Sequence, residues 1–538
     1  MKNKILLFAS AIAVLTSSCS EDFLTAEPIM SQSPETYYKN DEQMFSALVA
    51  AYDPLNYCSI NPLGYFVPYA EITSDNANTG LGGDNEKAEL RDMEMYRTTT
   101  VNEISEQTWK FNYMGVSRCN AVINAEFTSD KTKVYKAEAH FLRAWYMFQL
   151  QRNFGPCVIS LETDYPLEYP FERSTREQVN AQIEKDLEIA INGCDEKPEM
   201  TGRINKSAAR ALLAKHYLYA ADWDNDNAAT FKKAIPLFES VINSGQYNLL
   251  PYTKLFNYKY RNNKECIFEI QTTTLAAGQN KTDTPWTLDA GMWAKWCGTR
   301  TLKNHPLFHG EMMWGGMFLT KDLYDYYIDG DETRRDETFI TEAQMVLKGQ
   351  KGKDGKNPVK WNKAGANIMD WEGFDQRKFT VYWDTPFSGA MGHNKMFANV
   401  QVIRLSDVYL MLAEAYLRGE NNINKAKELI NAVRAAHEPN AKYLTVDDMM
   451  TAFPDRFPKV IDVLWYERRV ELAGEGDRRY DLVRSGRCKD VMTKFLSTGR
   501  LRNRVNITWN NTMNYMPIDI EETEACPTLT SYPDEAFK

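Results

Sequence analysis

Residues 209–245 read ARALLAKHYLYAADWDNDNAATFKKAIPLFESVINSG, and this stretch decides the fold. In its first part, alanines alternate with Leu and Tyr at three- and four-residue spacing, which is typical of one face of an α-helix. A polar break follows, and a second amphipathic segment begins at Phe231. Small residues let a neighbouring helix approach closely, while large residues fill the gaps between the helices. The stretch therefore predicts a pair of packed helices.

The same pattern recurs on both sides of this stretch. Residues 137–150 read AEAHFLRAWYMFQL, and residues 409–437 place YLMLAEAYLRG before INKAKELINAVRAAH. Such helix pairs resemble tetratricopeptide repeats, which stack because a single pair cannot bury its own apolar face. The spacing between the copies is not constant, so an irregular helical bundle remains the alternative. We predict a mainly α fold with a tetratricopeptide-like helix-pair scaffold.

A region of different composition separates the second copy from the third. Residues 249–399 are rich in Gly, Trp, Thr, Asn and Asp, and their helical periodicity is weak except at 319–328. Long loops in a compact domain are commonly functional, and the many tryptophans argue against disorder. We expect an irregular, loop-rich ligand-binding subdomain here. The predicted order is a signal peptide at 1–18, a lipid anchor, N-terminal segment and helix pairs at 19–248, this subdomain at 249–399, and C-terminal helices at 400–538.

The N-terminus combines two lysines with an apolar run at 5–15 that leads into Cys19. The run is too short to span a bilayer, so it predicts a secretory signal and not a transmembrane helix. A cysteine at the cleavage point resembles a bacterial lipobox, which implies that the Cys19 thiol is lipidated. Glu21 and Asp22 resemble the surface-export signal of Bacteroides-type lipoproteins. We expect an outward-facing, lipid-anchored protein of the outer membrane; the alternative is an ordinary cleaved signal with an accidental cysteine.

Composition narrows the classes of partner. The 538 residues carry a net charge of −10, which argues against nucleic acid because no basic stripe is available to replace counterions. None of the nine cysteines forms a CxxC pair, so zinc-ribbon and thioredoxin-type sites are not expected. Whether Cys266 and Cys297 form a disulfide stays open at this stage.

Several segments carry a family resemblance. The longest of them is 464–487, which reads LWYERRVELAGEGDRRYDLVRSGR. Three more are 331–338 (DETRRDET), 399–417 (NVQVIRLSDVYLMLAEAYL) and 515–520 (YMPIDI). In their order and spacing, these four segments resemble the SusD/RagB family. The resemblance implies a surface lipoprotein of Bacteroidetes that captures oligosaccharides and caps a SusC-like TonB-dependent transporter. The alternatives are a peptide-binding, RagB-like protein and a transporter lid with little ligand binding of its own.

Tryptophans of the irregular region are the candidate ligand contacts. An exposed indole offers a flat face to the C–H side of a sugar ring, although large aromatics are also common in cores. The resemblance places Trp314 where the starch-binding prototype has a stacking aromatic. Three further loop candidates precede it: Trp286, Trp293 and Trp296. Trp109, in a helical context, is predicted to be core.

A second contribution is expected from residues 71–78, which read EITSDNAN and resemble a family stretch with an acidic residue. The resemblance implies that Asp75 and Asn76 contact sugar hydroxyls. The next segment departs from the prototype, whose paired loop tryptophans are absent, and this departure argues against starch as the ligand.

The charged segment at 464–487 is interpreted as structure. Glu467 and Glu471 are four residues apart on one helix face, and the neighbouring arginines can pair with such carboxylates. The alternative is a site for an anionic ligand. We find no HExxH or GxSxG motif and no metal spacing among the histidines, so we predict neither an enzyme nor a metal or other cofactor.

Overall fold

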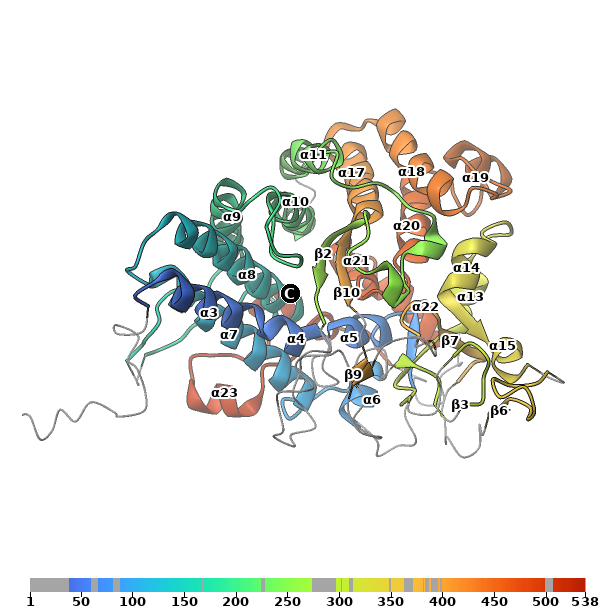
Figure 1. Ribbon diagram of the computed structural model, residues 1–538, viewed down its shortest axis with the longest axis horizontal. Helices are drawn as coiled ribbons and strands as arrows, with labels where there is room; N and C mark the ends of the chain where they lie inside the picture. Colours follow the sequence, from blue (N-terminus) through green and yellow to red (C-terminus); the bar gives the residue numbers. More distant parts are fainter. Residues whose placement is uncertain are drawn as a thin grey trace, which may run out of the picture.

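The structure is a computed structural model, and it describes most of the chain (Figure 1). The described residues are 38–59, 66–80, 88–166, 169–223, 228–272, 297–300, 302–308, 313–347, 350–361, 371–380, 382, 387–388, 395–396, 399–498 and 507–537. The fold is mainly helical, as predicted. The α-helices are α3 (Asp41–Tyr52), α4 (Pro54–Ser59), α5 (Phe66–Ile72), α6 (Ala88–Glu94), α7 (Glu103–Asn124), α8 (Asp130–Phe154), α9 (Arg176–Gly193), α10 (Lys206–Trp223), α11 (Ala228–Ile242), α13 (Lys321–Tyr326), α14 (Glu332–Thr338), α15 (Glu342–Val346), α17 (Leu405–Glu420), α18 (Ile423–His437), α19 (Val446–Ala452), α20 (Val460–Glu471), α21 (Arg478–Arg484), α22 (Cys488–Ser497) and α23 (Ile520–Ala525).

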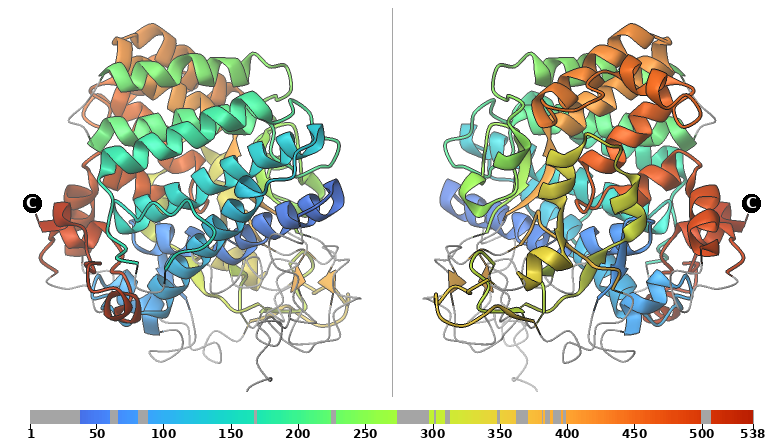
Figure 2. Two further views of the ribbon diagram at one scale, coloured as in Figure 1. Left: turned by 90° about the vertical axis from the view of Figure 1, so that its left-hand side faces the viewer. Right: turned by 90° about the vertical axis from the view of Figure 1, so that its right-hand side faces the viewer.

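The long helices pack in chain order as one continuous stack. The contacts run from α7 to α8, α9, α10 and α11 in turn. Helix α11 then packs against α17, and α17 packs against α18. Helix α11 packs against α17 although the irregular region lies between them in sequence, as both views of Figure 2 illustrate. The predicted helix pairs correspond to α10–α11 and α17–α18. The region 249–399 is therefore inserted into the scaffold without interrupting it.

Close helix approach depends on small residues, as the sequence pattern predicts. A Cβ atom added to Gly115 on α7 would lie 2.4 Å from the Tyr146 ring on α8, so only glycine fits this contact. Trp109, on α7, is 4% exposed and meets the Phe154 ring edge-on with centroids 5.2 Å apart. The prediction that Trp109 belongs to the core is confirmed.

The strands form five short antiparallel pairs among the described residues. The strands are β1 (Ala77–Thr79), β2 (Cys266–Ile270), β3 (Leu302–Lys303), β4 (Met317–Leu319), β5 (Phe339–Thr341), β6 (Lys360–Trp361), β7 (Phe374–Gln376), β8 (Phe387–Ser388), β9 (Lys395–Met396) and β10 (Val400–Arg404). Strands β2 and β10 pair with Val400 opposite Ile270, so the two ends of the irregular region meet. The four-part division of the chain remains a prediction.

Two further findings concern the membrane and the cysteines. Within the described residues, the helices lack the combined length and apolarity that crossing a bilayer requires. Cys266 and Cys297 are both free thiols, which answers the question left open by the sequence.

Candidate functional site

A two-stranded ribbon joins the N-terminal part of the chain to the irregular region. Strand β1 pairs antiparallel with β4, and Asn78 lies opposite Phe318. The pairing extends past the strands, because the Gly80 N–H donates to the Gly316 carbonyl at 3.0 Å. The segments around Asp75 and Trp314, which the sequence nominates separately, are thereby brought side by side.

Trp314 enters this ribbon from a tight turn. Its side chain is partly buried and packs against the main core, which leaves the remainder exposed. Gly315 has φ +64°, a conformation that side-chain-bearing residues rarely adopt, and its N–H donates to the Gly298 carbonyl at 3.0 Å. A Cβ at Gly315 would lie 3.1 Å from the Arg300 Cβ. An arginine therefore lies beside the turn that carries Trp314.

Arg300 is a candidate that the sequence analysis missed. It is partly exposed and belongs to a segment, 297–300, that carries no recognisable motif. Only the contact of that segment with the turn at Gly315 brings Arg300 close to the turn that carries Trp314. The combination of a flat apolar face and a cationic donor matches the two sides of a sugar ring.

Asp75 and Asn76 are deeply buried, at 3% and 1% exposed. Arg478 binds both Asp75 carboxylate oxygens, at 2.8 and 2.9 Å, and Arg469 approaches Oδ2 at 3.0 Å. Burial alone would raise the pKa of Asp75, but the guanidinium groups of Arg469 and Arg478 outweigh it and hold that pKa below its usual range. Asn76 accepts from Arg469 at 3.0 Å and donates to Glu71 at 3.0 Å.

This geometry does not favour contact between Asp75 or Asn76 and sugar hydroxyls. Instead, backbone groups of the same loop support the irregular region: the Thr320 N–H donates to the Asn76 carbonyl at 2.9 Å, and the Thr320 hydroxyl donates to the Asp75 carbonyl at 2.9 Å. Thr320 also caps α13. The contact of the two side chains with sugar stays a prediction, and the structure gives both a positioning role.

Four of the remaining candidates fall outside the described residues: Trp286, Trp293, Trp296 and Cys19.

The charged segment predicted to be structural is the centre of a buried ion-pair network. Arg468 on α20 binds Asp407 at 2.9 Å and Asp481 at 2.7 Å, and Lys215 on α10 reaches the same Asp407 at 3.1 Å. Arg484 on α21 holds both oxygens of Glu414 at 2.8 Å. These pairs tie α20 and α21 to helices of the scaffold.

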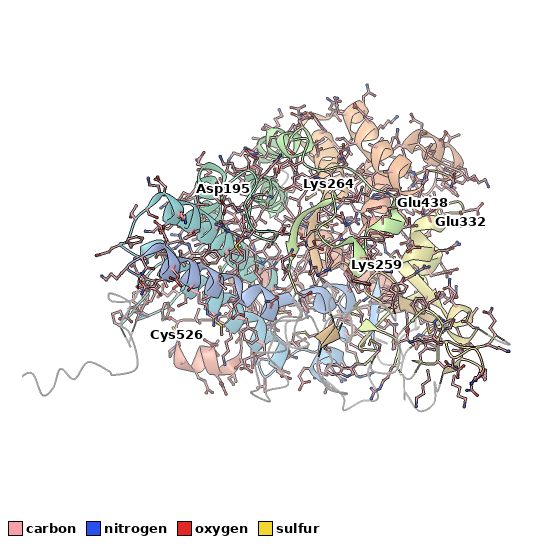
Figure 3. The ribbon with its side chains drawn as sticks, viewed as in Figure 1. Asp195, Lys259, Lys264, Glu332, Glu438 and Cys526 are labelled. Atoms are coloured by element: carbon pink, nitrogen blue, oxygen red, sulfur yellow. The ribbon has the colours of Figure 1, made fainter. Side chains whose placement is uncertain are left out.

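The network continues toward the irregular region. Arg404 at the end of β10 binds Glu471 at 2.6 Å and Glu475 at 2.7 Å. Arg334 on α14 binds Glu467 at 2.8 Å, and the backbone N–H groups of Thr333 and Arg334 donate to the Glu438 carboxylate. Figure 3 labels Glu438 next to Glu332, at the start of α14.

One group in this network has the composition of a metal site. Glu265, His437 and Glu471 bring their ligand atoms within 4.8 Å of one another. Burial would lower the pKa of His437, but the two carboxylates raise it to about 9. The imidazolium then donates from Nδ1 to Glu471 at 2.8 Å and from Nε2 to Glu265 at 3.3 Å. In the structure the three side chains therefore form an ion-pair cluster.

The architecture combines a stack of helix pairs with an inserted, loop-rich region. The described part of the candidate site lies in this region, where Trp314 is partly exposed beside the β1–β4 ribbon. The chain belongs to the SusD family, whose model matches residues 264–534. A second family model, described as "Starch-binding associating with outer membrane", matches residues 22–218.

Relatives extend the similarity over most of the chain. A SusD-like protein of Bacteroides ovatus is 26% identical over 513 residues, covering 90% of this chain and 82% of the relative. SusD-like protein P25 of Formosa agariphila is 24% identical over 542 residues, covering 95% of each. Among solved structures, a laminarin-binding SusD-like protein has a TM-score of 0.75 at 23% identity, covering 92% of this chain and 100% of that one. A surface glycan-binding protein of Bacteroides thetaiotaomicron with laminarihexaose has a TM-score of 0.72 at 22% identity, covering 91% and 99%.

Proposed function

We propose that this protein captures oligosaccharides at the cell surface and delivers them, chemically unchanged, to a SusC-like TonB-dependent transporter. Family membership supports this proposal, as do structural neighbours named for binding laminarin, laminarihexaose and other surface glycans. The description of the second family model supports a location at the outer membrane. In this proposal Cys19 carries the lipid that anchors the chain.

The observation that carries the proposal is the partly exposed Trp314 beside Arg300, on a ribbon fixed by β1–β4 pairing. The indole would stack on the apolar face of a sugar ring, and the guanidinium would donate to ring hydroxyls. Trp286, Trp293 and Trp296 are further candidates for stacking. Because each such contact retains little free energy after polar groups are desolvated, we expect modest affinity for the free protein.

Affinity electrophoresis against laminarin, starch and a panel of plant, fungal and host glycans tests the proposal. The chain without residues 1–19 is compared with Trp314→Ala and Trp314→Phe. We expect one glycan to retard the protein, Trp314→Ala to weaken binding by about tenfold or more through loss of the stacking face, and Trp314→Phe to retain most of it. Trp465→Ala, on α20, controls for the general loss of an indole.

Other outcomes separate the alternatives. Retardation that Trp314→Ala leaves intact would support glycan capture but contradict this site. No retardation by any glycan, together with capture of peptides, would favour a RagB-like peptide-binding protein. Loss of glycan uptake in cells without measurable binding would favour a lid for the transporter.

A further inference from the structure

A cavity of about 330 Å³ lies on the scaffold, apart from the β1–β4 ribbon. Three segments line it: the α9–α10 loop with residues 196–197 and 202–205, the loop after α11 with residues 245–247, and the β2 segment with residues 262–264, 266–269 and 271. Figure 3 labels Lys264 on the β2 side and Asp195, adjacent to Glu196, on the α9–α10 side. None of the residues around Trp314 belongs to its lining.

The lining of this cavity includes amides that hydrogen bonds hold in fixed orientations. Asn262 and Gln271 exchange hydrogen bonds, with the Asn262 amide donating at 3.0 Å and the Gln271 amide donating back at 2.9 Å. Asn205 caps α10 and donates to the Tyr247 hydroxyl at 3.0 Å. A primary amide has two N–H groups and a carbonyl with two lone pairs, so Asn205 and Asn262 keep capacity for ligand hydroxyls. Gln271 also donates to the Glu269 carbonyl at 2.9 Å and accepts from Asn399 at 3.0 Å, so its amide is fully used and serves to hold Asn262 in place. The walls are therefore preorganised to bind hydroxyl groups.

Two aromatic side chains line the cavity. Phe268 is 3% exposed and packs against Phe141 and Trp145 with interplanar angles of 89° and 88°, whereas Tyr247 is half-buried and its hydroxyl accepts from Asn205. Most of the other side chains that line the cavity are polar or charged, which favours recognition by hydrogen bonds and charge.

The charges at the cavity are unbalanced in favour of cations. Glu196 is paired with Arg210 at 3.0 Å, and Arg203 is paired with Glu138. Glu269 is buried, accepts the Asn262 N–H at 2.7 Å, and has a pKa raised by burial to about 7. Lys197 and Lys264 are exposed, and neither has a carboxylate partner within the part of the chain that the structure describes. Two cations without a carboxylate partner in the described part of the chain thus line one cavity of a protein whose net charge is −10.

We propose that this cavity is a second binding site, which takes a sugar residue bearing a carboxylate or sulfate. Lys197 and Lys264 hold the anionic group, and the Asn205 and Asn262 amides bind the hydroxyls. The volume is at the lower end of the range for small-molecule sites, so the cavity accepts a chain end or a short oligosaccharide.

Isothermal titration calorimetry tests the site with trigalacturonate, a sulfated heparin disaccharide and neutral galactotriose. We expect an anionic probe to bind and galactotriose to give no measurable heat. Lys197→Met with Lys264→Met should weaken binding by roughly tenfold or more, and more strongly at low salt. Lys259→Met is the matched control, because Lys259 lies outside the lining (Figure 3). Trp314→Ala should leave this affinity unchanged, which separates the site from the proposed glycan capture.

Four results with these probes and variants would overturn the proposal, and a fifth comes from a peptide control. They are an absence of heat with both anionic probes, equal affinity for galactotriose, unchanged affinity in the double lysine variant, and loss of binding in Trp314→Ala. Equal binding of triglutamate would show that the cavity recognises carboxylates without the sugar, and would also contradict it.

Discussion

At the scale of single residues, His437 shows how burial and pairing compete. The side chain is completely buried, and burial alone would favour the neutral ring. Glu471 and Glu265 face its two nitrogens, Arg404 contacts both carboxylates, and the Tyr252 ring lies 5.3 Å away. The carboxylates prevail and raise the pKa of His437 to about 9.

This pKa predicts a loss of stability on the alkaline side. In the unfolded chain the pKa of histidine is about 6.5, so between pH 6.5 and 9 the folded state binds more protons. The stabilisation from His437 is complete below pH 6.5 and is lost as pH rises through about 9, with a total of about 3 kcal/mol. Urea unfolding at intervals from pH 6 to pH 10 measures it. In His437→Gln, the decline of the unfolding free energy over this window should be shallower; identical slopes would show that His437 is neutral when folded.

Asp75 shows why site residues are harder to predict than core residues. The sequence around Asp75, SDNAN, is typical of a polar loop, where Asp75 and Asn76 could either contact a ligand or pair within the protein. The partners of Asp75 are Arg469 and Arg478, which lie near the other end of the chain. Only the assembled fold shows that these arginines form ion pairs with the Asp75 carboxylate. By contrast, Trp109 could be assigned to the core from local helical periodicity alone.

At the scale of elements, the helices were predictable and the strands were not. The periodicity of α8, α10 and α17 is a local signal that each segment carries by itself. Strands β1 and β4 have three residues each, too few for an alternating pattern, and they pair across more than 200 positions. The positions of Trp314 and Arg300 depend on that ribbon, so the geometry of the candidate site was inaccessible to sequence reasoning.

Buried ion pairs join helix α20 to its neighbours. Removing one partner of such a pair should therefore lower the stability of the protein substantially. Arg468→Met leaves Asp407 and Asp481 short of a buried counter-charge, because among the described residues Lys215 alone still pairs with Asp407 at 3.1 Å and Arg484 with Asp481 at 2.8 Å. We expect a loss of about 3–5 kcal/mol in the free energy of unfolding, measured in urea.

Two variants control for this prediction. Lys425→Ala removes an exposed pair with Glu428 and should change stability by less than about 1 kcal/mol. Arg468→Lys keeps the charge without the two-pronged geometry and should fall between wild type and Arg468→Met. If Arg468→Met is no more destabilised than Lys425→Ala, the network does not hold α20 in place.

At the scale of the whole molecule, the two proposed sites differ in chemistry and in the part of the fold that builds them. The Trp314 site depends on the inserted region and offers an aromatic face with one cation. The second cavity lies where scaffold loops meet β2, and offers amides and lysines. A protein with both could hold neutral and acidic parts of one branched glycan together, and linkage of two weak contacts raises the overall affinity.

A lipid at Cys19 is the predicted anchor of the chain, and it would hold the protein at the outer membrane. Expressed with its own leader in a Bacteroidetes host, the wild-type chain should sediment with membranes, because one lipid group adds about 0.8 kcal/mol per buried CH₂. Cys19→Ala should move the chain to the supernatant and abolish incorporation of an alkyne-labelled fatty acid. Glu21→Ala with Asp22→Ala is the matched variant: it should keep the lipid and the membrane fraction but lose accessibility to protease added outside intact cells. Membrane retention of Cys19→Ala would contradict lipidation, and unchanged protease accessibility of the acidic-residue variant would contradict the export role of Glu21 and Asp22.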